Sequence, residues 1–204
     1  MGGSCVALVM AIAQAGSFDD FFRAVHVDDV GAVNDLLARG FDPNAIGEKG
    51  QPGLVMALRD GADKVAASLL AHPHIVIDTA NTADETALMM AALRGRLEWC
   101  QRLLDRGAKL DRTGWTPLHY AATGPEPKVV ALLIGRGAPI EALSPNRTTP
   151  LMMAARYGAD ESALLLLARG ADTKARNDVG LNAADFAKLA GRTKLAERLE
   201  ASVR

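Results

Sequence analysis

Two histidines are the residues best suited to bind a metal ion. His72 and His74 are separated by one residue, and Asp78 follows nearby. Imidazole nitrogens and carboxylates bind zinc, but protein zinc sites use three or four ligands in suitable spacing. An isolated His-x-His without a convincing third ligand is weak support for such a site. We therefore predict no metal site and no cofactor, with a zinc site at His72, His74 and Asp78 as the alternative.

The other residues that could do chemistry do not form a catalytic pattern. His119 has no Ser, Cys or carboxylate in a recognisable triad. Cys5 and Cys100 form neither a Cys-x-x-Cys motif nor a disulfide framework, and a free cysteine such as Cys100 is usually a small buried hydrophobe with an inert thiol. None of the 19 glycines belongs to a nucleotide-binding pattern. We predict that the protein is not an enzyme.

Composition indicates which elements must position these residues. The chain has 204 residues, of which 49% are hydrophobic but only 4% aromatic, so its apolar content is mostly Ala, Leu, Val and Met. This mixture favours helices over strands. The 24 acidic and 23 basic residues nearly cancel, and no run of five like charges occurs, so we expect no nucleic-acid partner.

A repeat of about 33 residues organises the sequence. An apolar residue followed three positions later by Ala recurs at intervals of 33, 34, 30 and 33 residues. These pairs are Phe21/Ala24, Leu54/Ala57, Leu88/Ala91, Leu118/Ala121 and Leu151/Ala154. Nineteen residues after each apolar residue stands a helix-ending residue, at Gly40, Pro73, Gly107, Gly137 and Gly170. The constant spacing predicts a pair of helices in each repeat, with the helices beginning and ending at equivalent positions.

The clearest copies are 116–122 (TPLHYAA) and 149–155 (TPLMMAA), the second joined to 165–172 (LLLARGAD). In these copies Thr can cap a helix, Pro suits the first helical position, and Gly suits the left-handed residue after a helix. These residues resemble the ankyrin repeat, and the chain as a whole resembles exported bacterial ankyrin-repeat proteins.

The resemblance extends from about Ser17 to the C-terminus and implies one all-α domain, residues 16–204. It implies an ankyrin-repeat solenoid of about six helix-turn-helix repeats with short hairpin fingers. We expect repeats at about 17–50, 51–84, 85–114, 115–147 and 148–180, with a polar cap at 181–204.

Departures from the pattern predict local differences. The interval of 30 places a three-residue deletion between Gly107 and Gly114, so that finger should be short. In the second repeat the second helix should end at Pro73 instead of at a left-handed Gly. The resemblance also implies that His119 is a structural imidazole bonded to Thr116. Of the pairs Met89/Met90 and Met152/Met153, we expect one residue to be core and the other to approach the concave face.

The resemblance places partner contacts on the concave side, which the first helices and the fingers line. Arginine recurs there on one stripe, and arginine and aromatic residues are frequent interface hot spots. We predict a non-catalytic, monomeric scaffold that binds a protein with an acidic or mixed surface. The predicted partner-binding residues are Arg59, Arg94, Trp115, Arg156 and Tyr157. The alternative for the arginines is an ion pair with a carboxylate of a neighbouring finger.

Two other functions remain open. One is an accessory or inhibitor module that modulates a specific enzyme, for which the resemblance permits a periplasmic enzyme of oxidative stress. The other is an effector that acts inside a host cell. The cellular location would discriminate between them.

The first 15 residues differ from the rest. Residues 5–13 (CVALVMAIA) form an apolar run followed by Ala13-Gln14-Ala15, as in a signal peptide cleaved near Ala15. The run is too short to span a bilayer. We therefore predict a periplasmic or secreted protein without membrane insertion. Against this, residues 1–4 contain no Lys or Arg, and the alternative is an N-terminal capping helix in a cytoplasmic or host-cell protein.

Overall fold

The computed structural model describes residues 16–202. The predicted signal peptide, residues 1–15, lies outside the described residues. The chain divides into two compact units, Met1–Ala87 and Leu88–Arg204, and each unit is described by itself. Residues 16–202 form helices and loops without a strand, and Ile46 and Pro52 form an isolated antiparallel bridge. The predicted all-α fold class is confirmed.

The first unit contains a helix over 16–26 and three further helices. These are α2 (Val30–Ala38), α3 (Gly53–Asp60) and α4 (Asp63–Ala71). Helix α4 packs against both α2 and α3. Phe21, Val33, Leu58 and Leu69 are fully buried in this unit. The Phe21 ring stacks on Phe41, with ring centroids 4.6 Å apart.

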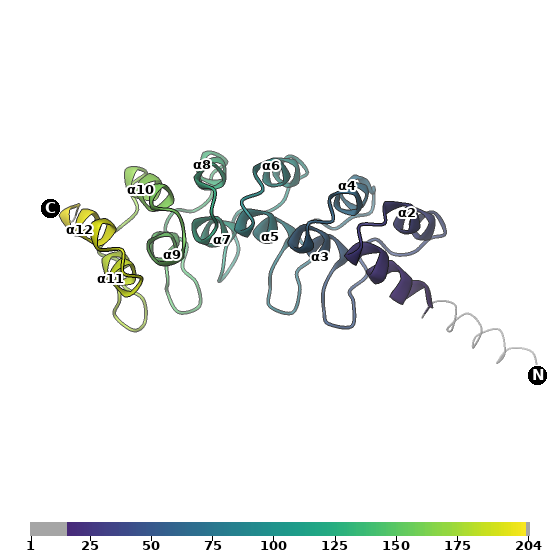
Figure 1. Cartoon of the computed structure of the whole chain (residues 1–204), viewed down its shortest axis with the longest axis horizontal. Coiled ribbons are helices and arrows are strands. Elements are labelled where there is room, and N and C mark those ends of the chain that lie inside the picture. The colour runs from purple at the N-terminus through teal and green to yellow at the C-terminus, as the bar shows by residue number, and fades with distance from the viewer. Residues whose placement is uncertain (1–15, 203–204) are drawn as a thin grey trace, which may run out of the picture. The chain divides into compact units, whose positions relative to one another are not determined.

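The second unit contains four consecutive helix pairs. They are α5 (Ala87–Leu93) with α6 (Leu97–Asp105), α7 (Pro117–Thr123) with α8 (Pro127–Gly135), α9 (Pro150–Tyr157) with α10 (Asp160–Ala168), and α11 (Ala183–Leu189) with α12 (Thr193–Ala201). Among the first helices, α7 packs on α9 and α9 packs on α11, while α8 packs on both α6 and α10. Within this unit the first helices form one layer, the second helices form another, and the long loops extend from the first layer (Figure 1).

Local chemistry explains where the helices begin and end. Thr149 caps α9, because its Oγ1 accepts a hydrogen bond from Met152 N at 3.3 Å, and Pro150 occupies the first turn. Thr116 and Pro117 take the same positions at α7. At the other end, left-handed glycines follow second helices, as with Gly137 at φ +93°. In α4, by contrast, His72 is extended before Pro73 and the helix ends at Ala71, as predicted.

Small residues let neighbouring first helices approach closely. Ala121, Ala122, Ala154 and Ala155 are buried between helices. Gly158, which ends α9, lies so near α7 that a Cβ atom there would be 1.9 Å from the carbonyl oxygen of Ala122. This contact sets the spacing of α7 and α9, and therefore the spacing of the side chains that both helices present.

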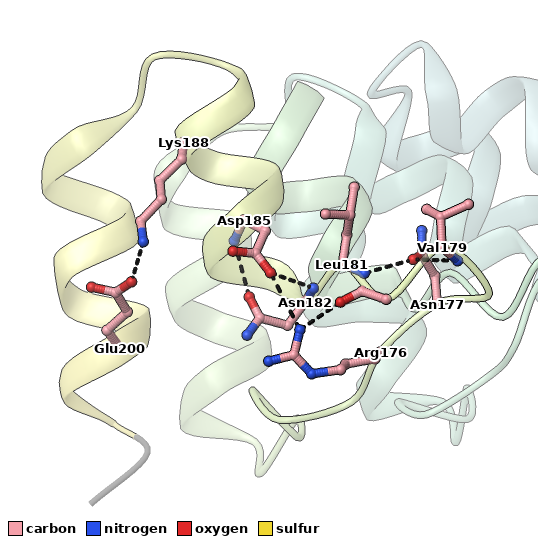
Figure 2. A network of polar contacts seen from close by, with 9 residues as sticks. Arg176, Asn177, Val179, Leu181, Asn182, Asp185, Lys188 and Glu200 are labelled. Carbon is pink, nitrogen blue, oxygen red and sulfur yellow. Dashed lines mark hydrogen bonds and ion pairs between the residues drawn. The ribbon is translucent and has the colours of Figure 1, made fainter.

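The loops between helix pairs, the fingers, are held by short side chains. Asn177 Oδ1 accepts hydrogen bonds from the backbone N–H groups of Val179, at 3.2 Å, and Leu181, at 2.9 Å (Figure 2). Ser144 Oγ accepts one from Thr148 N at 2.9 Å in the preceding finger. The finger over 106–116 is three residues shorter than the one over 136–149, which confirms the predicted short finger.

Candidate protein-binding site

His119 ties a finger to the first-helix layer of the second unit. Its side chain is fully buried, and Nδ1 accepts a hydrogen bond from Thr116 N at 3.1 Å and lies 2.9 Å from Thr116 Oγ1. Because Nδ1 is the acceptor, Nε2 carries the proton and donates to the carbonyl oxygen of Thr148 at 2.9 Å. Burial lowers the pKa of His119, so the ring is a neutral bridge between two repeats. The predicted bond to Thr116 is confirmed.

Trp115 stands over this imidazole and lines a small apolar pocket. The two rings meet edge to face, with centroids 5.2 Å apart and planes at 79°. The pocket has a volume of about 210 Å³. Its lining comes from α5, α7, α9 and the finger before α7, and comprises Leu93, Trp115, His119, Tyr120, Thr123 and Met153. Small-molecule sites usually measure about 300–1,000 Å³, so this pocket suits a single side chain better than a free ligand.

Arg156 and Tyr157 lie on α9 one helical turn beyond Met153. The Arg156 guanidinium lies 5.3 Å from the centre of the Tyr157 ring and 5.9 Å from that of Phe186. Both distances are within the range of cation–π contacts. Tyr157 nevertheless remains 57% exposed, which leaves one of its faces available to a partner.

Arg94 follows Leu93 at the end of α5 and is exposed. Four of the five predicted partner-binding residues are thus in the second unit, either in the wall of the pocket or within four residues of its lining in sequence. We call this area the first-helix surface. It consists of Leu93, Arg94, Trp115, Tyr120, Met153, Arg156 and Tyr157.

The fifth predicted residue, Arg59, lies in the first unit and is already paired. Its Nε and Nη2 donate to Asp60 at 2.7 and 3.0 Å, and Nη1 donates to Gln51 at 3.4 Å. The hydrogen bond to Asp60 raises the pKa of Arg59 and lowers that of Asp60. A guanidinium held in this way has less to offer a partner.

Sequence reasoning missed part of the pocket wall. Leu93, Tyr120 and Met153 were not among the five predicted partner-binding residues, although Tyr120 and Thr123, like Met153 and Arg156, are three apart and so share one helix face. The expectation for the methionine pairs was right for Met152, which is buried, and Met153, which is half-buried. It was wrong for Met90, which is buried like Met89.

The other candidate residues are placed differently. Burial raises the pKa of the Cys100 thiol to about 12, so the thiolate is scarce at neutral pH, as expected of an inert cysteine.

The His72 and His74 rings lie 5.8 Å apart. Residues 16–202 contain no group of three or more His, Cys, Asp or Glu suited to hold a metal ion. Over the same residues, every helix is too short or too polar to cross a bilayer.

A larger cavity, of about 650 Å³, lies in the first unit. Its lining includes Phe18, Arg39, Phe41 and Ser17. Because Ser17 is next to the point where the described chain begins, residues 16–202 do not define the full extent of this cavity. The cavity therefore carries no proposed site.

Comparisons with known proteins agree with the repeat architecture. Residues 21–113 and 109–177 match the family model described as ankyrin repeats (3 copies). The nuclear factor NF-kappa-B p105 subunit of Gallus gallus is 32% identical over 162 residues, which are 76% of this chain and 16% of that protein. Ankyrin repeat and KH domain-containing protein 1 of Homo sapiens is 39% identical over 104 residues, 48% of this chain and 4% of that protein. The chain thus spans about a sixth or less of these curated relatives.

Among solved structures, one similar chain comes from the complex of the predatory endopeptidase Bd0816 from Bdellovibrio bacteriovorus with the immunity protein Bd3460. The similarity has a TM-score of 0.76 at 26% sequence identity. It covers 89% of the present chain and 97% of the matched chain.

Proposed function

Because this chain belongs to the ankyrin-repeat family, whose repeats are generally protein–protein interaction modules, we propose that it is a non-catalytic scaffold that binds a partner protein through the first-helix surface. One observation carries the proposal. Trp115 lines an apolar pocket, Arg94 directly follows the pocket residue Leu93, and Arg156 and Tyr157 lie one helical turn beyond the pocket residue Met153 on α9. Arginine and aromatic side chains around a desolvated pocket are the composition of an interface hot spot.

Affinity capture followed by mass spectrometry tests this function. The full chain is immobilised beside the double variant Trp115→Ala plus Arg156→Ala. A control variant, Arg106→Ala plus Arg169→Ala, changes exposed arginines that follow the second helices α6 and α10. The proposal expects a partner captured by the unchanged chain and by the control, but lost from the first-helix variant. If all three capture the same partners equally, the proposed surface is wrong.

A second candidate function is an accessory module that restrains one enzyme. It is supported by the similarity to a chain from a complex between an endopeptidase and an immunity protein. The two functions differ in their consequence for the partner. If the captured partner is an enzyme, its activity should fall on addition of stoichiometric chain and stay unchanged with the first-helix variant. If the partner enzyme keeps its full activity in the complex, the accessory function is wrong and only the scaffold function is supported.

We also propose that the protein is exported, cleaved near Ala15, and monomeric. The apolar run and the Ala13-Gln14-Ala15 site support export. N-terminal sequencing of the periplasmic fraction should find Gly16 as the first residue. An intact Met1 in the cytosolic fraction would contradict export and favour the intracellular or host-cell alternative. Light scattering after gel filtration should give the mass of one chain.

A further inference from the structure

Charge is divided unequally between the two units, although the whole chain is nearly neutral. Residues 1–87 contain 12 Asp and Glu against 5 Lys and Arg, a formal charge of −7. Residues 88–204 contain 12 against 18, a formal charge of +6. The unit that carries the first-helix surface is therefore basic, and it attracts acidic partners over a distance of about 10 Å at moderate salt.

Several cations of the second unit are already paired with carboxylates. Arg136 Nη2 lies 2.8 Å from Asp105, and Arg192 bonds to Asp160. Figure 2 shows two further pairs, Lys188 with Glu200 and Arg176 with Asp185, the latter at 3.6 Å. These pairs lower the attraction of their cations for an external anion.

The two arginines of the first-helix surface differ from these. In the described part of the chain neither Arg94 nor Arg156 has a carboxylate partner. Arg156 instead packs on the rings of Tyr157 and Phe186, which holds the guanidinium in place without neutralising its charge. Arg94 is exposed directly after the pocket residue Leu93. Both cations are therefore available to carboxylates of a partner.

The pocket that Trp115 lines favours an apolar group. Leu93, Trp115, Tyr120 and Met153 give it a largely apolar lining, and its volume of about 210 Å³ is below that of small-molecule sites. The imidazole in its wall, that of His119, uses both ring nitrogens within the protein. The lining thus favours burial of one aromatic or large aliphatic side chain.

We propose that the partner presents an acidic segment with a single apolar anchor. The anchor side chain enters the Trp115 pocket, and Asp or Glu residues beside it pair with Arg94 and Arg156. This inference rests on the proposed function and adds the chemistry of the partner to it. Bidentate pairing of guanidinium with carboxylate gives such an interface its orientation, and burial of the anchor gives most of its affinity.

Synthetic peptides test this chemistry on the full chain. The probes are capped pentapeptides: acidic Asp-Glu-Phe-Glu-Asp, its phenylalanine-to-alanine form, and basic Lys-Lys-Phe-Lys-Lys. The readout is the indole N–H resonance of Trp115, which is assigned with the Trp115→Phe variant and distinguished from that of buried Trp99. The proposal expects a saturable shift with the acidic phenylalanine peptide and roughly tenfold weaker binding of each of the other two.

Variants of the chain provide the second arm. Arg94→Ala plus Arg156→Ala should weaken binding of the acidic phenylalanine peptide about tenfold, whereas the control Arg106→Ala plus Arg169→Ala should keep it within about threefold. Equal binding of the acidic and basic peptides, or no saturable shift with the acidic phenylalanine peptide, overturns the proposed partner chemistry.

The two proposals fail separately. If affinity capture still depends on Trp115 and Arg156 while the peptides fail, the scaffold function stands and the acidic anchor is wrong. If capture does not depend on these residues, the proposed function itself is wrong.

Discussion

Replacing Gly158 with alanine should destabilise the second unit, because the substitution forces two first helices apart. Gly158 has φ −84°, which alanine adopts without strain, so the effect comes from space and not from backbone conformation. The added Cβ would stand 1.9 Å from the carbonyl oxygen of Ala122, whereas Cβ contacts under 3.0 Å are essentially never seen. The gap between α7 and α9 must therefore widen by about 1 Å.

The free-energy cost depends on the buried contacts between α7 and α9 that this widening disturbs. Ala122, Ala154 and Leu151 are at most 1% exposed, and the obstructing atom belongs to the backbone, so no flexible side chain can yield. Overpacking of a core usually costs about 1–3 kcal/mol, and the rigid neighbour places this substitution in the upper half, about 2–3 kcal/mol.

Gly135→Ala is the matched control for this prediction. Gly135 is the last residue of α8, is exposed, and has nothing within 4 Å of the place that a Cβ atom would take. Alanine there should be neutral or stabilise by up to about 0.5–1 kcal/mol through helix propensity. Urea unfolding followed by circular dichroism measures both variants, and Gly158→Ala should lower the midpoint by about 1 M. A Gly158→Ala midpoint equal to that of the unchanged chain would refute the described packing of α7 on α9.

Three other substitutions or conditions have defined outcomes. Ser162→Ala should stabilise the protein by about 1 kcal/mol in urea unfolding, because Ser162 Oγ is buried without a hydrogen-bond partner in residues 16–202; destabilisation would contradict this. Since burial lowers the pKa of His119 below its unfolded value, the stability from its neutral form is present above about pH 6.5 and is lost as the pH falls below it. Thermal melting from pH 8 to 5.5 should show this fall, and a His119→Gln variant should show a flatter profile. In a Cys5→Ser background, Cys100 should react with a thiol reagent at pH 8 only after unfolding, because burial raises its thiol pKa to about 12.

Most of the helix positions could be predicted from the sequence because the same residue types recur at the helix ends of several repeats. The Thr-Pro pairs at α7 and α9 and the glycines after second helices are chemical requirements of helix ends, so their spacing gave the helix positions directly. The end of α4 at Ala71 and the short finger over 106–116 followed from departures from this spacing.

The finger turns could not be predicted in the same way. The turns depend on a side-chain oxygen that accepts a hydrogen bond from a backbone N–H group. This oxygen belongs to the hydroxyl of Ser144 in one finger and to the amide of Asn177 in another, and only the hydrogen bonds show that the two residues play the same part. The role of Gly158 was also hidden, because it depends on the distance to Ala122 in another repeat.

The candidate site was only partly predictable. Trp115 was predicted as a large apolar residue on a finger, but the pocket also needs Leu93 and Met153, whose approach depends on how α5, α7 and α9 stack. Arg59 was placed in one class with Arg94 because each occupies one of the two variable positions near the end of a first helix. The neighbouring Asp60 makes the difference, and only its hydrogen bonds to Arg59 show it.

The affinity of the purified captured partner for three forms of the chain tests the central claim most directly. Titration calorimetry should give a dissociation constant at least about 30-fold weaker for Trp115→Ala plus Arg156→Ala than for the unchanged chain, as expected for the loss of hot-spot residues. The control Arg106→Ala plus Arg169→Ala should stay within about threefold. Circular dichroism must show that all three are equally folded. A first-helix variant that binds as tightly as the control would contradict the claim that the partner binds on the first-helix surface.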